Sequence, residues 1–575
     1  MQNLAHARHR HTLTVGTLTL LAALSGACST METGANEESG ALTSSDSQAT
    51  APQSSSAEGS GSDSFVGTTS GGSSWTGGDE GATGDWTASA SAGGTTGGYD
   101  PSGEEPPDDS GQGTTGGEDD TGASSSTGDT TTGGEVCDDV TPVTLYLSPD
   151  DSNSTSSPVQ ARDAVLGGFG SLYYVPIRPW EFLNYYTFDY EAAEPGGVKV
   201  TPELARLEGA PDGEYTLQIG VSSQALSNAD RPAMNVTLVL DESGSMSGPP
   251  IEIEREVCRV IASSLRAGDK VSAVGWDTVN AVKLTAHAVT GPNDATLVAL
   301  CNALEAGGGT DLNGGLTAGY ELAQQQFDAD RVNRVVLISD GGANAGVTDI
   351  DLIAGGAGSQ DQDGIYLVGV GVGTADSYND ELMDTVTDVG RGASLFVGDK
   401  AEAEKMFGDR FVATMQVAAR DVRVRLDMPP GFEVVKASAE EISADPQAVE
   451  PQHLAPNDAM VFHQTLATCA PQLVDEAASF TVSVQFVDAK TFEPKQVVEQ
   501  RLIQEAVMAA SPKLLKGAAV FAYAESLKAW RDGVVDHAAA LAPAFAALAA
   551  AEAALPGDAD LAEIRAVLEA VQAMG

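Results

Sequence analysis

The sequence predicts an α/β protein with a doubly wound, mostly parallel sheet at its centre. Three observations indicate this fold class. Apolar runs of strand length alternate with helical patterns through the middle of the chain, a long Gly, Ser and Thr-rich stretch precedes them, and a strand-rich and then helical stretch follows. Strands that alternate with helices at this spacing favour a parallel sheet covered on both faces. We therefore expect this domain to carry flanking β-rich and helical segments and a disordered N-terminal tether.

The chain begins with a pattern typical of a secretory signal. Two arginines precede an uncharged stretch, residues 12–27, whose apolar part is too short to be a membrane-spanning helix. Ser25-Gly26-Ala27 then precede Cys28 and resemble a bacterial lipobox, although Ser25 stands where leucine is usual. We expect residues 1–28 to be a lipoprotein signal peptide with Cys28 lipidated. The alternative is an ordinary secretory signal, with Cys28 free or removed.

Residues 29–135 consist mainly of Gly, Ser, Thr, Asp and Glu, and no Lys or Arg lies between Arg10 and Arg162. Such a segment buries too little apolar surface to offset its ordering entropy, so we expect a disordered linker. As a flexible coil it spans on the order of 50 to 60 Å. The net charge of -52 also argues against nucleic acid or an anionic lipid surface as a partner.

The rest of the chain is long enough for two or three units. We divide it into an N-terminal extension at 145–232, the central domain at 233–412 and a C-terminal domain at 415–575, β-rich and then helical. The central strands are expected at 234–240, 270–276, 281–287, 334–339, 364–370 and 393–397, with helices at 252–265, 294–305, 314–326 and 380–389. The turn at 278–280 implies one antiparallel edge pair.

Polar residues follow two of these strands, and a third polar segment lies between them in the chain. Asp241-Glu242-Ser243-Gly244-Ser245 follows an apolar run, Asp340-Gly341 follows another, and Gly307-Gly308-Gly309-Thr310 opens a helical pattern. Ligands of open parallel sheets bind outside the carboxyl ends of the strands. Hard divalent cations prefer oxygen ligands. We therefore expect a site for Mg²⁺, or for Mn²⁺ or Ca²⁺, whose ligand residues are Asp241, Ser243, Ser245, Thr310 and Asp340.

Together these three segments resemble the metal-ion-dependent adhesion site (MIDAS) of von Willebrand factor type A (VWA) domains, which have a Rossmann-like fold. The resemblance implies that a carboxylate of a protein partner fills an open position on the metal. The flanks, including 177–190 and 422–502, are similar to a bacterial subfamily of VWA lipoproteins. The aromatic residues Trp180, Phe182, Tyr185, Tyr186 and Phe188 of the first flank are expected in the core.

Four cysteines follow Cys28, an even number that permits three pairings. Cys258 and Cys301 lie on two helical patterns of the central domain. We therefore favour disulfides between Cys258 and Cys301 and between Cys137 and Cys469, with buried thiols as the alternative.

The sequence favours a non-enzymatic function. It contains no His-Glu-x-x-His, Gly-x-Ser-x-Gly or phosphate-binding Gly-x-x-x-x-Gly-Lys motif. We expect an exported protein, lipid-anchored in the cell envelope on the periplasmic face or at the cell surface, that binds a protein partner through the metal and meets the membrane only through its anchor. A scaffold for an envelope complex with a structural metal is the alternative, and a metal-dependent phosphoester hydrolase is a minor one.

Overall fold

The computed structural model describes residues 137–150, 152–168, 170–343, 364–474, 477–533 and 535–574. The expected signal peptide, its Cys28 and the expected linker lie outside the described residues.

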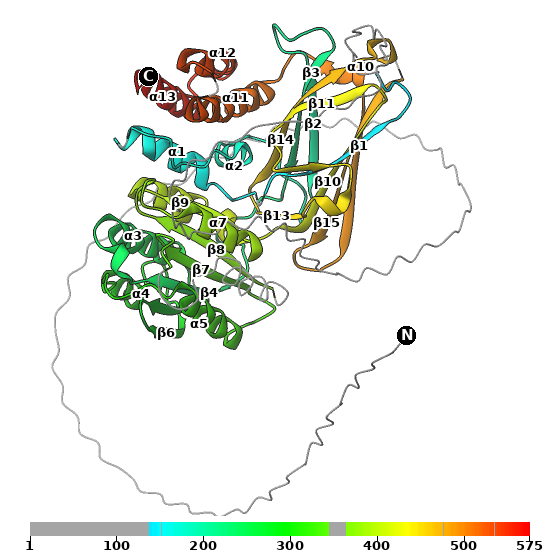
Figure 1. The fold of residues 1–575 in the computed structure, drawn as a ribbon. Helices are drawn as coiled ribbons and strands as arrows, with labels where there is room; N and C mark the ends of the chain where they lie inside the picture. Colours follow the sequence, from blue (N-terminus) through cyan, green and yellow to red (C-terminus); the bar gives the residue numbers. More distant parts are fainter. Residues whose placement is uncertain are drawn as a thin grey trace, which may run out of the picture. The chain divides into compact units, whose positions relative to one another are not determined.

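The central sheet has the strand order β6-β5-β4-β7-β8-β9 (Figure 1). Its strands are β4 (Met234–Asp241), β5 (Lys270–Trp276), β6 (Asn280–Ala288), β7 (Val332–Ser339), β8 (Ile365–Val372) and β9 (Ala393–Val397). Only β6, at one edge, pairs in the antiparallel sense; the other pairs of this sheet are parallel. Every residue of β4 is buried, as expected for a parallel strand covered on both faces. The predicted doubly wound sheet and its antiparallel edge are confirmed.

Helices cover both faces of this sheet. They are α3 (Pro249–Ser264), α4 (Ala295–Asn302), α5 (Leu312–Gln325), α7 (Asp380–Val389), α8 (Lys400–Glu404) and α9 (Phe411–Met415), with the short turns η1 (Gly244–Met246) and η2 (Lys405–Asp409). Successive side chains of a strand point to opposite faces. Accordingly Leu238 and Leu240 pack with α3 and α4, whereas Val239 packs with α5 and α7. The ends of the predicted central helices and strands lie within three residues of those in the structure.

Two further sheets lie beside the central domain, with the orders β12-β1-β10-β15-β16, in which β13 pairs with β10, and β11-β14-β3-β2-β17. The strands are β1 (Val143–Ser148), β2 (Lys199–Ala205), β3 (Glu214–Ser222), β10 (Ala419–Met428), β11 (Phe432–Ala437), β12 (Glu441–Ser443), β13 (Gln452–Leu454), β14 (Ala459–Thr468), β15 (Ser479–Asp488), β16 (Pro494–Leu502) and β17 (Val507–Met508). Side chains from both sheets, including Leu426 and Ile219, form one core.

This pairing joins the predicted N-terminal extension at 145–232 to the predicted C-terminal domain at 415–575. β1 pairs with β10, and β3 pairs with β14, so strands that precede and follow the central domain share sheets. A disulfide between Cys137 and Cys469, with Cα atoms 5.7 Å apart, also joins the two parts. Strand alternation shows which face of a strand is buried but not which strand pairs with it. The sequence therefore could not reveal that the two flanks form one flanking module.

The remaining helices belong to this flanking module. They are α1 (Ser156–Leu166), α2 (Pro179–Tyr185), α10 (Ile503–Ala506), α11 (Pro512–Asp532), α12 (His537–Ala554) and α13 (Ala559–Met574), with the turns η3 (Pro446–Ala448) and η4 (Pro471–Leu473). Phe182 of α2 is buried, and its ring meets that of Tyr523 in α11 at 5.2 Å. Phe182, Tyr185 and Tyr186 are core residues, as predicted, while Phe188 is partly buried against the same core.

Among the described helices, α12 is long and apolar enough to cross a membrane by length and composition. One face of α12 buries Leu541, Ala544 and Leu548 in the same core as residues of α11 and α13. A helix in the core of a folded bundle can have the same length and apolar composition. Packing against α11 and α13 therefore accounts for these properties of α12.

Candidate functional site

The candidate site lies where two neighbouring parallel strands end. Asp241 is the last residue of β4, and Asp340 directly follows β7, which pairs with β4 in parallel. The carboxyl ends of parallel neighbours meet at one edge of the sheet, so both aspartates lie there. We call residues 241–246 the Asp241 loop, residues 307–311 the Thr310 loop and residues 340–343 the Asp340 loop.

Hydrogen bonds connect the side chains of the first and last of these loops. Asp241 Oδ1 accepts a bond from the Ser243 backbone N–H at 2.9 Å, so the carboxylate shapes its own loop. The hydroxyl oxygens of Ser243 and Ser245 lie 3.0 Å apart, and Ser245 Oγ donates to Asp340 Oδ1 at 3.3 Å. Four of the five predicted ligand residues therefore form one connected group of oxygen atoms.

Thr310 completes this group. Backbone bonds join the Thr310 loop to the Asp241 loop, from Gly307 N–H to the Glu242 carbonyl at 2.7 Å and from Gly244 N–H to the Gly308 carbonyl at 3.3 Å. A Cβ placed on Gly342 would lie 3.1 Å from Asp340 Oδ1, 3.3 Å from Ser245 Oγ and 3.4 Å from Thr310 Cγ2. The three loops thus converge on one small space, which a side chain at position 342 would crowd.

The site combines burial with negative charge. Asp241 is fully buried, and Asp340 is 6% exposed. The pKa of Asp241 is raised to about 7, mainly by burial and to a smaller extent by Asp340, although hydrogen bonds from Ser339 and Ser243 lower it. Ser339 Oγ donates to Asp241 Oδ2 at 2.6 Å. None of the groups that shift this pKa most strongly is a Lys or Arg, so a positive charge would stabilise the ionised form.

Glu254 of α3 belongs to this environment and was missed by sequence reasoning. Its side chain is fully buried, and Oε1 accepts the Asp241 backbone N–H at 3.0 Å. Oε2 has no hydrogen-bond partner within the part of the chain that the structure describes. Burial, and then the nearby Asp241, raise the pKa of Glu254 well above its usual range. The only indication of this role in the sequence was that Glu254 lies on the apolar face of an amphipathic helical pattern.

The donor atoms suit a hard divalent cation. The described residues contain no group of three or more His, Cys, Asp and Glu side chains placed to hold a metal. Three of the five residues of the candidate site carry hydroxyls and only two carry carboxylates. A site with two carboxylates and several hydroxyls fits Mg²⁺, which uses few carboxylates and keeps water ligands. Asp311 has a different task, since its Oδ1 accepts the Gly314 backbone N–H at 3.0 Å and caps α5.

Disulfides hold the surrounding structure. Cys258 of α3 is bonded to Cys301 of α4, with Cα atoms 5.6 Å apart. The structure therefore contains the two pairings that the sequence favoured, this one and the bond between Cys137 and Cys469.

The fold and the three loops define a VWA domain. Residues 236–343 match the family described as von Willebrand factor type A domain, and the chain contains such a domain. This class of domain generally mediates protein–protein interactions, which supports an adhesion or interaction role in broad terms.

Two bacterial proteins are similar to part of the chain. The uncharacterized protein YfbK of Escherichia coli (strain K12) is 25% identical over 264 residues, which cover 44% of this chain and 45% of that protein. The uncharacterized protein sll0103 of Synechocystis sp. is 27% identical over 222 residues, which cover 39% of this chain and 51% of that protein. The chain thus spans about half the length of these curated relatives.

A solved structure described as von Willebrand factor type A from Catenulispora acidiphila matches 62% of this chain and 87% of that chain. Its sequence identity is 14% and its TM-score 0.41.

Proposed function

We propose that the candidate site binds a divalent cation, Mg²⁺ or alternatively Mn²⁺ or Ca²⁺, and that the cation binds a carboxylate of a protein partner. The observation that supports this proposal is the convergence of Asp241, Ser243, Ser245, Thr310 and Asp340 at one edge of the sheet. When bound, the cation supplies a positive charge and an open coordination position. The side chains supply oxygen atoms and a buried, negatively charged setting.

The chemistry of the site favours recognition over catalysis. Two carboxylates and hydroxyls hold a cation, but hydrolytic metal sites commonly use more carboxylates or histidines, often around two ions. His463, for example, is buried against Gln218 in the flanking module, where it bonds the Gln218 side chain at 3.0 Å. A phosphoesterase is tested by metal-stimulated hydrolysis of a generic phosphoester that Asp241→Ala abolishes.

We further propose that the protein is exported and anchored by a lipid on Cys28. The two disulfides support export, because such bonds persist in oxidising compartments. Mass spectrometry of the N-terminal peptide from envelope fractions tests the anchor. A lipidated Cys28 at the mature N-terminus is the expected result.

Calorimetric titration of Mg²⁺ and Mn²⁺ into the chain lacking its first 28 residues tests the metal site. We expect saturable binding that the double change Asp241→Ala, Asp340→Ala abolishes. The matched control is Asp328→Asn, Asp330→Asn, which removes the same charge before β7, at the other end of the strand. A folded protein that binds neither ion at millimolar concentration contradicts the proposal.

The scaffold alternative makes a different prediction. Binding of a carboxylate-bearing protein that is lost in EDTA and in the double variant supports recognition. Metal-dependent thermal stability without metal-dependent binding of a partner supports a structural metal.

A further inference from the structure

The segment that joins β8 to α7, residues 373–379, packs against the candidate site. Asn379 N–H donates to the backbone carbonyl of Asp340 at 3.0 Å. Gly341 has a φ of 79°, and a Cβ on it would lie 2.6 Å from the Asn379 carbonyl oxygen. The Asp340 loop therefore passes closer to Asn379 than a side chain at position 341 would allow. Whatever fixes Asn379 also limits where the Asp340 carboxylate can lie.

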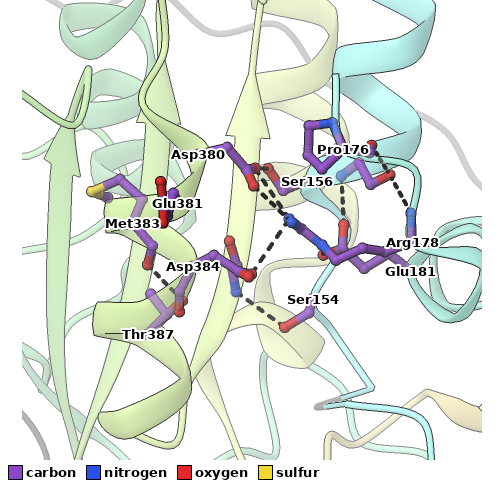
Figure 2. A network of polar contacts seen from close by, with 12 residues as sticks. Ser154, Ser156, Pro176, Arg178, Glu181, Asp380, Glu381, Met383, Asp384 and Thr387 are labelled. Carbon is purple, nitrogen blue, oxygen red and sulfur yellow. Dashed lines mark hydrogen bonds and ion pairs between the residues drawn. The ribbon is translucent and has the colours of Figure 1, made fainter. Parts of the chain in front are cut away.

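The residue after Asn379 is held by the flanking module. Figure 2 shows Arg178 between Asp380 and Asp384, with Ser156 beside Asp380. Arg178 donates from Nη1 to Asp380 Oδ2 at 2.7 Å and from Nη2 to Asp380 Oδ1 at 3.1 Å. Ser156 Oγ donates to Asp380 Oδ1 at 3.1 Å. This bidentate contact fixes the orientation of the Asp380 carboxylate as well as its distance from the Arg178 guanidinium.

Arg178 is in turn fixed by buried partners. Its Nε donates to Glu181 Oε1 at 2.6 Å, and Asp384 lies 3.4 Å from Nη2. Glu181 is fully buried, and its other oxygen accepts the Ser157 backbone N–H. The arginine is thus anchored by α1 and α2 on one side and by the first turn of α7 on the other. A second link runs from the Ala375 N–H to Asp163 Oδ2 at 3.3 Å.

We propose that Arg178 and Asp380 are positioning residues for the candidate metal site, acting through Asn379 and the Asp340 backbone. This inference rests on the proposed function for its metal readout. The flanking module, from outside the VWA domain, then sets part of the site's geometry. Metal sites depend on such supporting contacts, whose loss typically lowers metal affinity about 10- to 100-fold.

The variant Asp380→Asn tests this inference. It removes the charged contact with Arg178 but keeps the size of the side chain and the bonds of Arg178 to Glu181 and Asp384. We expect the Kd for Mg²⁺, measured by calorimetry on the chain lacking its first 28 residues, to rise about 10-fold. We also expect faster hydrogen exchange at the Gly341 and Gly342 amides in metal-free protein.

Asp558→Asn is the matched control. Asp558 also begins a helix and contacts a buried cation, since Lys516 Nζ lies 2.8 Å from its Oδ2. This variant loses an equivalent ion pair next to α13, so it reports loss of stability alone. We expect its Mg²⁺ affinity and its exchange at residues 341 and 342 to equal those of the unchanged protein.

The two readouts separate the inference from the proposed function. If the unchanged protein binds no Mg²⁺, the proposed function fails, and the exchange measurement still decides the positioning role. If Mg²⁺ binds but Asp380→Asn alters neither affinity nor exchange, the inference is wrong and the metal proposal stands. Equal effects in Asp558→Asn would also overturn it, because they would show general destabilisation.

Discussion

Two buried acidic clusters lie on either side of the β8–α7 segment, and they differ in the source of positive charge. Around Arg178, three carboxylates face a guanidinium that the chain itself provides. At the candidate site, Asp241 and Asp340 are joined by hydroxyls and backbone N–H groups. Burial raises the pKa of Glu181 to about 7 even though Arg178 lowers it, and the pKa of Asp241, also raised by burial, is about 7 as well. Burial is thus common to both clusters, but only the first has a cation that the described part of the chain supplies.

The largest expected effect comes from removing the internal cation. Arg178→Met leaves Glu181, Asp380 and Asp384 buried or half-buried without their guanidinium. Breaking a buried ion pair in this way costs about 3–5 kcal/mol, which is measured by denaturant unfolding at pH 7.5.

The triple variant Arg178→Met, Glu181→Gln, Asp380→Asn supplies the control, because it removes two of the stranded carboxylates and recovers part of the lost stability. A loss below about 1 kcal/mol in Arg178→Met would show that solvent, and not Arg178, compensates these acids.

His463 extends this comparison to a buried titratable group whose pKa is shifted by burial alone. Burial alone lowers the pKa of His463 to about 4 from 6.5, and the residue is 3% exposed. The unfolded chain therefore binds a proton at higher pH than the folded one. The contribution of the neutral, buried His463 to the free energy of unfolding is fully present above pH 6.5 and is lost as the pH falls toward 4. Since one pKa unit is about 1.4 kcal/mol, it amounts to about 3 kcal/mol.

The measurement is the free energy of unfolding of the unchanged protein and of His463→Asn across this pH range. We expect the unchanged protein to lose up to about 3 kcal/mol more on acidification. Parallel pH profiles for the two proteins would contradict a neutral buried histidine.

The smallest expected effect is a change in stability on replacing Asp241. At the candidate site we expect this change to be a gain, whereas removing Arg178 from the other cluster is expected to cause a loss. In EDTA at pH 8, Asp241→Asn removes an ionised carboxylate that burial disfavours, so we expect a stability gain on the order of 1–2 kcal/mol. With Mg²⁺ at about 100 times its Kd, the unchanged protein should gain about 2.7 kcal/mol, and the variant should gain nothing. Thermal unfolding with and without Mg²⁺ measures both terms. Destabilisation of Asp241→Asn in EDTA would show that the acid is structurally required.

Local pattern was sufficient to predict the central sheet and the convergence of its polar loops. The apolar run ending at Asp241 and the one ending before Asp340 mark neighbouring strand ends, and glycines before Thr310 mark the loop between them. Metal binding, the lipid anchor and the partner stay predictions, since they depend on groups outside the described chain.

Contacts between segments that are distant in the chain could not be predicted from the sequence. Arg178 and Asp380 are 202 positions apart, and neither belongs to a recognisable motif. β3 and β14 are both largely apolar strands whose sequences fit many partners, so their pairing could not be chosen. Glu254 resembled any charged residue of an amphipathic helix until the fold placed it beneath Asp241.

The disulfide between Cys137 and Cys469 has a mechanical consequence. It closes a covalent loop that contains the whole VWA domain, since the two cysteines are 332 positions apart. Tension applied between the residues before Cys137 and the C-terminus passes through the bond and bypasses the loop. Tension between the residues before Cys137 and a partner held at the candidate site reaches the VWA domain by two covalent routes, one from each flank. A load-bearing attachment at this site would therefore divide its force between both ends of the domain.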